Sequence, residues 1–267
     1  MRIQFSLTVA AGKWLIASAV SALPVITKAF QTGRILLKGG TTVSAVCELL
    51  TGSSMMISGR ISPTGTRTAP FLSSAHHPHA LLLDRGTAGP VAAADWPDVM
   101  AGMKRGDCLV TGANLIDAHG GAALMCGSPY GDGAGPWLGA APVEGFEIIV
   151  AAGLEKLVPG RVEDLVRTSG RRLVDRSYGM AVGLLPLHGR ILTEIEAVTS
   201  LADVACWVVG RGGVHGAEGG TTLVVEGDDE QVAIVEQAYL EARGKAHSGT
   251  PESLNQECQA GSPGCRH

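Results

Sequence analysis

Apolar residues fall along the chain either in short continuous runs or in stripes with helical spacing. The continuous runs lie at residues 35–37, 80–84, 107–112, 146–151 and 204–209. Stripes with helical spacing lie between them, at residues 12–30, 43–50, 95–103, 161–169 and 191–201. Continuous apolar strands that alternate with helices are typical of a parallel sheet covered on both faces. We therefore expect an α/β fold, with a mostly parallel sheet and helices on both faces.

The same pattern predicts the domain organisation. Residues 1–225 are expected to form one α/β domain that binds an anionic metabolite. Asp228 is expected to cap a terminal helix within residues 226–244, with Gln231 in the capping-box position. Residues 245–267 are rich in Ser, Gly, Pro and Gln and have no periodicity, so the pattern predicts a disordered tail.

Loops that directly follow the predicted strands form the main functional argument. They lie at residues 38–42, 112–121, 127–135 and 153–156. Ligands of open parallel sheets bind beyond the carboxyl ends of the strands. If all these strands are parallel, the loops share one edge of the sheet, and a ligand site is expected there.

The segment Lys38-Gly-Gly-Thr-Thr42 stands between a predicted strand and a predicted helix. The first amides of a helix lack internal acceptors and attract anions. Lys38, Gly39, Gly40, Thr41 and Thr42 are therefore predicted to bind phosphate or carboxylate, with Thr41 or Thr42 also able to cap the helix. The alternative is a tight turn that binds nothing. Gly219-Gly-Thr-Thr222 repeats the letters but precedes a strand, so no anion site is expected there.

Polar residues in the other loops are candidates for the chemistry. Glu155 and Lys156 follow a strand and are predicted to transfer protons or stabilise charge, although surface ion pairs are also common there. Asn114 and Asp117 could be a polar pair that orients a substrate, or turn residues that stabilise the loop, and His119 could transfer a proton. Four further residues are predicted to contact the substrate: Gly112, Asn114, Gly127 and Ser128.

Composition excludes some classes of function. The net charge is −4, there is no basic block and aromatic residues make up 4% of the chain, so a nucleic-acid surface is not expected. His76, His77 and His79 lack a recognised ligand spacing, so no metal is predicted. The six cysteines include no C-x-x-C pair, which favours a reducing, cytoplasmic compartment. No cofactor is predicted, and a homo-oligomer is compatible with the sequence.

The apolar N-terminus has two interpretations. Residues 1–23 could be a signal peptide, but Lys13 splits the apolar run. The stripe that includes Leu15, Ile16 and Val20 favours an amphipathic helix on the domain instead. No segment reaches the length of roughly 18–20 apolar residues that a membrane span requires, so no contact with a membrane is expected.

Three segments carry a resemblance to a known superfamily. They are Gly39-Gly-Thr-Thr42, Thr111-Gly-Ala-Asn-Leu-Ile-Asp-Ala-His-Gly120 and Ile148-Ile-Val-Ala-Ala-Gly-Leu-Glu-Lys156. Together they resemble the superfamily of ribose-5-phosphate isomerase A, glucosamine-6-phosphate deaminase and the CoA transferases. The last two segments also look like the lactate-utilisation proteins of that fold. The resemblance implies a NagB/RpiA/CoA transferase-like fold and a substrate that is a phosphorylated sugar or an acyl-CoA.

The sequence also departs from that superfamily. Asn114 stands where the isomerases carry an aspartate, and the E-N-G glutamate of the CoA transferases is missing from its usual form, with Glu218 the nearest equivalent. The resemblance therefore implies an isomerase or transferase, with proton abstraction next to a carbonyl if the substrate is a sugar phosphate. The alternative is a non-catalytic protein that binds a metabolite or has a regulatory function.

Overall fold

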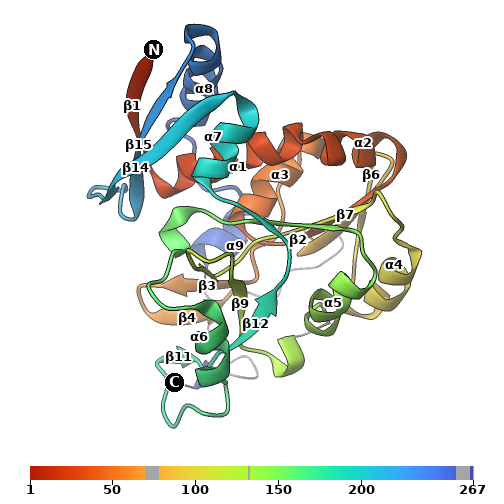
Figure 1. The fold of residues 1–267 in the computed structure, drawn as a ribbon. Helices are drawn as coiled ribbons and strands as arrows, with labels where there is room; N and C mark the ends of the chain where they lie inside the picture. The colour runs from red at the N-terminus through yellow and green to blue at the C-terminus, as the bar shows by residue number, and fades with distance from the viewer. Residues whose placement is uncertain (70–77, 132, 257–264, 267) are drawn as a thin grey trace.

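The computed structural model describes residues 1–69, 78–131, 133–256 and 265–266. Its centre is a six-stranded sheet in the order β13-β10-β7-β2-β5-β6 (Figure 1). The bounds of these strands are Arg190–Leu192 for β13, Glu147–Ala151 for β10, Cys108–Thr111 for β7, Arg34–Lys38 for β2, Ala80–Asp84 for β5 and Thr87–Pro90 for β6. The predicted α/β class is confirmed, and the sheet is mixed.

The expectation of a mostly parallel sheet is not confirmed, and the condition that all these strands are parallel fails at β5. The neighbours β13, β10, β7 and β2 are parallel, whereas β5 is antiparallel to both β2 and β6. A tight turn at Arg85 and Gly86, both with positive φ, joins β5 to β6. A central strand is apolar on both faces whichever way it runs, so the apolar run at 80–84 did not reveal its direction.

Helices cover both faces of this sheet. Alternate residues of β2 point to opposite sides, so Ile35 and Leu37 belong to one buried cluster and Leu36 to another. The first cluster includes residues of α1 (Val9–Ala22), α2 (Pro24–Thr32), α3 (Thr41–Thr51) and α7 (Glu194–Leu201). The second includes residues of α4 (Trp96–Gly102) and α5 (Gly135–Ala140).

The predicted break at Pro24 is confirmed, because it separates α1 from α2. Two other predictions about helices are wrong. Neither Thr41 nor Thr42 caps α3, because its N-cap residue is Gly40. The predicted helix from residue 191 begins only at Glu194, since residues 190–192 pair as β13. Thr193 and Glu196 form the capping box of α7.

A second, antiparallel sheet pairs the N-terminal strand with two strands from residues 204–227, in the order β1-β15-β14. Its strands are β1 (Arg2–Leu7), β15 (Gly220–Gly227) and β14 (Val204–Gly212), and α8 (Asp229–Ala242) packs beside it. Strand β1 was not predicted, because its six residues at the chain terminus look like part of an apolar segment. Gln231 does not complete a capping box, because its Oε1 accepts a hydrogen bond from the Asp203 amide instead.

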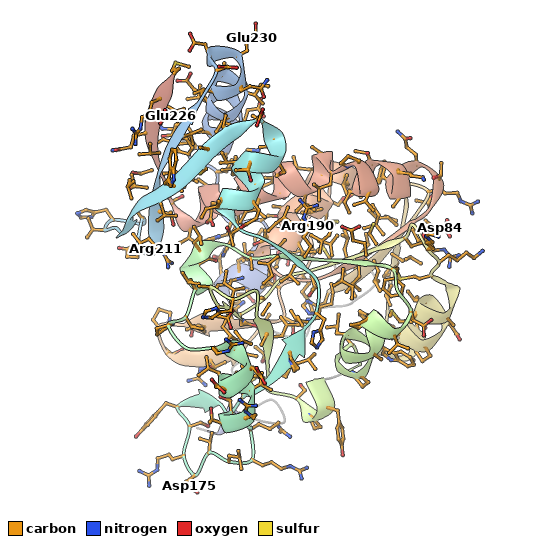
Figure 2. All side chains as sticks on the ribbon, in the orientation of Figure 1. Asp84, Asp175, Arg190, Arg211, Glu226 and Glu230 are labelled. Carbon is orange, nitrogen blue, oxygen red and sulfur yellow. The ribbon has the colours of Figure 1, made fainter. Side chains whose placement is uncertain are left out.

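Two smaller sheets complete the described fold, in the orders β16-β11-β4-β3 and β12-β9-β8. Their strands are β3 (Gly59–Ser62), β4 (Gly65–Thr68), β8 (Leu115–Ile116), β9 (Ala122–Cys126), β11 (Gly179–Met180), β12 (Gly183–Leu187) and β16 (Cys265–Arg266). Further helices are η1 (Ala93–Asp95), η2 (Pro129–Gly131), η3 (Ala141–Val143), η4 (Leu154–Lys156), α6 (Val162–Thr168) and α9 (Pro251–Asn255). Charged side chains such as Asp175, Glu226 and Glu230 lie at the edges of the molecule (Figure 2).

Residues 245–256, expected to be part of a disordered tail, are packed against the domain. Ser248 is buried and its hydroxyl is hydrogen bonded to Ser44 Oγ and to Glu48 Oε2, both at 2.8 Å. The Ser253 hydroxyl accepts a hydrogen bond of 3.0 Å from the Ile57 amide. This segment is held by buried hydroxyls with distant partners, which leave no apolar periodicity in the sequence. The rest of the predicted tail, residues 257–264 and 267, lies outside the described residues.

Within the described ranges, no single helix is long and apolar enough to cross a membrane. Helices α1 and α2 together reach that length and apolar character, with a 62° bend between them. Cys47, Cys108, Cys126 and Cys206 are free thiols.

Candidate functional site

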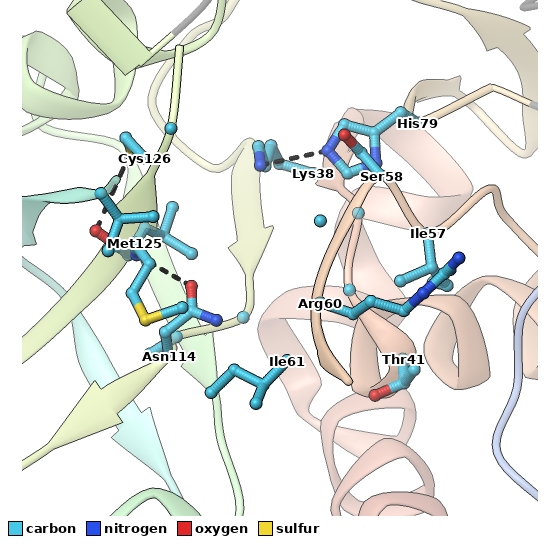
Figure 3. A pocket seen from close by; sticks show the side chains of 18 of the residues that line it. Lys38, Thr41, Ile57, Ser58, Arg60, Ile61, His79, Asn114, Met125 and Cys126 are labelled. Atoms are coloured by element: carbon cyan, nitrogen blue, oxygen red, sulfur yellow. Dashed lines mark hydrogen bonds between the residues drawn. The ribbon is translucent and has the colours of Figure 1, made fainter. Parts of the chain in front are cut away.

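A cavity of about 610 Å³ opens beyond the carboxyl ends of β2, β7 and β10. Its volume lies within the usual range of small-molecule sites, roughly 300–1,000 Å³. In Figure 3, Lys38, His79, Arg60 and Thr41 face Asn114 and Met125 across this space. The loops that the sequence analysis placed on one edge of the sheet therefore meet at one cavity.

Most of the predicted site residues line this cavity: Lys38, Gly39, Gly40, Thr41, Thr42, Gly112, Asn114, Gly127, Ser128, Glu155 and Lys156. Asp117 and His119 are not among its lining residues. The carboxylate of Asp117 accepts hydrogen bonds from the amides of His119, Gly121 and Val162 at 2.7–2.8 Å. Asp117 therefore stabilises its own turn, and His119 is exposed to solvent.

The first helical turn of α3 forms one end of the cavity. The first helical hydrogen bond runs from the Ser44 amide to the Gly40 oxygen at 2.7 Å, so the amides of residues 41–43 have no acceptor within the helix. The Thr42 hydroxyl is buried and has no hydrogen-bond partner among the described residues. Free donors and the positive end of the helix dipole coincide here, which is the arrangement that binds anions.

Arg60 adds a cation to the lining of the same cavity as this helix terminus. It belongs to β3, and in the view of Figure 3 it lies on the same side of the cavity as Ile57 and Thr41. Both terminal nitrogens of its guanidinium are buried without a hydrogen-bond partner in the described part of the chain. A buried charge that lacks a partner is costly, so an anionic ligand would satisfy this guanidinium. The sequence analysis missed Arg60 because it lies in a segment that looked like a loop.

Lys38 and His79 form a polar pair in the same region. His79 Nδ1 lies 3.0 Å from the Met56 oxygen, and its Nε2 lies 3.2 Å from Lys38 Nζ. A carbonyl oxygen only accepts, so Nδ1 carries the hydrogen and Nε2 accepts from the Lys38 ammonium. Burial, together with the charge of Lys38, lowers the pKa of His79 to about 3. The histidine is therefore neutral, and the positive charge stays on Lys38.

The antiparallel direction of β5 explains why His79 is in the site. It pairs Ala80 with Lys38, which brings the preceding residue beside the end of β2. The described residues contain no group of three or more side chains that could hold a metal ion. His76 and His77 lie outside the described residues.

A cluster of acids and lysines forms another part of the cavity. Glu155 and Lys156 lie on η4, just after β10, and Lys13 reaches them from α1. Lys13 Nζ lies 3.5 Å from Glu155 Oε1, and both carboxylate oxygens of Glu155 are buried without a hydrogen-bond partner in the described ranges. Behind them, the buried Glu194 accepts a hydrogen bond of 2.8 Å from the Leu154 amide.

The surroundings move the pKa values of two of these groups towards neutral pH. Burial raises the pKa of Glu194 to about 7, and the nearby charge of Glu155 adds to the shift. Burial lowers the pKa of Lys156 to about 8, and the charge of Lys13 acts in the same direction. Acids and bases that titrate near neutrality are suited to proton transfer and are common at catalytic sites.

Lys13 and Glu194 were not recognised as site residues from the sequence. Lys13 left a signal, because it is a charge within the apolar stripe of a buried helix. Glu194 left none, because an acidic residue in the first turn of a helix is favourable for the helix itself. His247 also lines the cavity, although its segment was expected to be disordered.

The remaining wall of the cavity is apolar. Asn114 Oδ1 accepts a hydrogen bond of 2.9 Å from the Met125 amide, which fixes the side chain at the edge of this wall. The wall itself consists of Leu124, Met125, Leu138, Met180, Val182 and Leu185. The cavity can thus hold a ligand that combines an anionic group, a reactive centre and an apolar part.

A scan against family models, a search of curated proteins and a search of solved structures each find no match to this chain.

Proposed function

We propose that this protein is a small-molecule enzyme that acts on an anionic metabolite with a carbonyl group, of the phosphorylated-sugar or acyl-CoA class. The observation that carries the proposal is the buried Arg60 guanidinium, which has no hydrogen-bond partner among the described residues and lines the same cavity as Glu155 and Lys156. An anion held by Arg60 and the first turn of α3 would leave the rest of the ligand near the acids and lysines.

In this proposal the anion is bound by the amides of residues 41–43, the Thr42 hydroxyl and Arg60. Glu155 is the general base, because its carboxylate lines the cavity and its oxygens have no hydrogen-bond partner among the described residues. Lys156 stabilises the negative charge that develops on the carbonyl oxygen. The reaction class is proton abstraction next to a carbonyl, as in an isomerase.

The resemblance of three segments to the NagB/RpiA/CoA transferase-like superfamily supports this proposal, with one reassignment. Asn114 replaces the isomerase aspartate, and its Oδ1 is occupied by the Met125 amide. Proton transfer is therefore assigned to Glu155. The same feature favours a second candidate function, a non-catalytic protein that binds the metabolite, because a lost aspartate and an intact anion site are compatible with sensing.

The proposal is tested first by binding. Calorimetry and thermal shift with inorganic phosphate, sugar phosphates and CoA esters should find at least one anion that stabilises the wild-type protein. Arg60→Gln should weaken that binding by about tenfold or more, since hydrogen bonds to charged groups contribute about 1.5–3 kcal/mol. Arg172→Gln, an exposed arginine outside the cavity, is the matched control and should bind normally. Absence of stabilisation by every anion would refute the proposal.

Turnover then separates the two candidate functions. A stabilising ligand should be converted by the wild-type protein and bound but not converted by Glu155→Gln. If the wild type binds the ligand without converting any of the panel, the non-catalytic function is favoured.

A further inference from the structure

Two lysines, Lys13 and Lys156, lie near the Glu155 carboxylate at the acid–lysine end of the cavity. Lys13 Nζ is paired with Glu155 at 3.5 Å. Lys156, the residue next to Glu155 in the chain, makes no side-chain hydrogen bond or ion pair within the described residues, although it lines the cavity. The carboxylate is therefore engaged by Lys13, and the second amine is left available to a ligand.

Lys156 lies in a partly buried site among charges of both signs. Lys13 disfavours its protonated form, Glu155 and Glu194 favour it, and His247 lines the same cavity. Glu155 attracts the ammonium but is already paired, and Glu194 is buried and hydrogen bonded to the Leu154 amide. Consistent with this arrangement, burial and the charge of Lys13 lower the pKa of Lys156 to about 8. Desolvated lysines beside another cation are the usual amine nucleophiles of enzymes.

We propose that Lys156 captures the carbonyl carbon of the ligand as an imine, with the anionic group of the ligand held by Arg60 and the first turn of α3. This inference rests on the proposed function, because it takes an anionic carbonyl compound as the ligand. It replaces charge stabilisation by Lys156 with a covalent bond to the same substrate. Once its nitrogen takes up a proton, the imine makes the neighbouring carbon more acidic than the parent carbonyl does, which assists proton abstraction by Glu155.

The step balances without any further reagent. The lone pair of the neutral Lys156 amine forms a bond to the carbonyl carbon, and the carbonyl π electrons move to oxygen, which takes up the proton released by nitrogen. The carbinolamine then loses its hydroxyl group and a nitrogen proton as water, and a C=N bond replaces the C=O bond. Glu155 is placed to accept and return the protons. Water hydrolyses the imine and releases the product.

The test uses pyridoxal 5′-phosphate as a probe that carries a phosphate, an aldehyde and an apolar ring, followed by reduction with borohydride and peptide mass spectrometry. The expected result is a stable label on Lys156, favoured by at least about tenfold over the exposed Lys28 and Lys104, since a lowered pKa supplies far more neutral amine at pH 8. Lys156→Arg should abolish this label, and Lys28→Arg should leave it unchanged. Pyridoxal without phosphate should label Lys156 more slowly.

The outcomes distinguish this inference from the proposed function. If phosphate binds but the label spreads equally over exposed lysines, the imine is refuted and the anion site stands. If Lys156 is labelled equally by both probes and phosphate does not compete, the nucleophile stands and the anion site is refuted. Labelling of the wild-type protein can be mapped directly, so the test still decides if Lys156→Arg fails to fold.

Discussion

The chain contains the letters Gly-Gly-Thr-Thr twice, at residues 39–42 and 219–222, and the two copies have different structures. In the first copy, Gly40 precedes α3, and the amides that follow have no acceptor within the helix. In the second, residues 220–222 lie in β15 between β1 and β14, where Thr221 pairs with Leu7 and with Arg211. The same four residues therefore supply free donors in one place and strand pairing in the other.

This difference shows that the motif does not create an anion site by its letters. The backbone of the second copy is used in a ladder, and its Thr222 hydroxyl is paired with Ser6 at 2.8 Å. In the first copy the Thr42 hydroxyl is buried and has no hydrogen-bond partner among the described residues. What distinguishes the copies is the element that follows, because a helix start leaves amides free and a central strand does not.

The two copies of the Gly-Gly-Thr-Thr segment lie near different groups of cavity residues. A Cβ added at Gly219 would lie 3.6 Å from Glu155 Cβ, so the second copy packs beside the acid–lysine cluster. The first copy instead lines the end of the cavity where we propose that an anion binds.

The largest expected effect comes from a matched pair of glycine substitutions. Gly40 has φ 153° and Gly219 has φ 79°, so alanine at either position should lower the free energy of unfolding by about 1–3 kcal/mol. No atom lies within 4 Å of a Cβ at Gly40, so the domain should still fold. Only Gly40→Ala should weaken phosphate binding, by about tenfold or more, because its backbone must shift the α3 amides. Calorimetry measures both affinities, and equal losses would contradict the comparison.

A second effect concerns the acids beside the second copy. The pKa of Glu194 is raised from 4.5 to about 7, so the folded protein holds its proton more tightly than the unfolded chain. The stability that this proton provides is complete below pH 4.5 and is lost as the pH rises through 7. Glu194→Gln should remove that loss, and its melting temperature should exceed that of the wild type by a few degrees at pH 8.

The measurement for Glu194 is the difference between variant and wild type at each pH. His79 contributes the opposite slope between pH 6.5 and about 3, because its pKa is lowered and its neutral form is the one that folds. A difference that does not change between pH 4.5 and 8 would show that Glu194 is ionised at all these values.

The smallest effect comes from the threonines. Thr42→Val removes a buried hydroxyl with no partner among the described residues, so the free energy of unfolding should stay the same or rise by up to about 1 kcal/mol while phosphate binding weakens. Thr222→Val removes an exposed hydrogen bond to Ser6 and should cost up to about 1 kcal/mol without changing phosphate binding. Chemical denaturation measures the change in the free energy of unfolding of each variant, and calorimetry measures its phosphate binding. A clear loss of stability in Thr42→Val would mean that its hydroxyl has a structural partner.

The sequence by itself determined the local features. The end of β2 at Lys38, the helix start after Gly40, the break at Pro24 and the buried strand β10 all follow from residues close together in the chain. Because the parallel strands end at one edge, the sequence also placed Gly39, Asn114 and Lys156 at a single cavity. These features depend on short-range sterics and periodicity, which a single sequence contains.

Only the tertiary structure decided which side chains complete the site. His79 lies in the site because β5 runs antiparallel to β2. Arg60 lies there because the segment after α3 folds into a hairpin, and Lys13 lies there because α1 packs against the sheet. Residues 245–256, expected to be part of a disordered tail, are held by Ser248 and Ser253 through hydrogen bonds to distant residues. Each of these depends on contacts between residues far apart in the chain, whose partners a local pattern does not specify, so folding alone brings the cations and acids together.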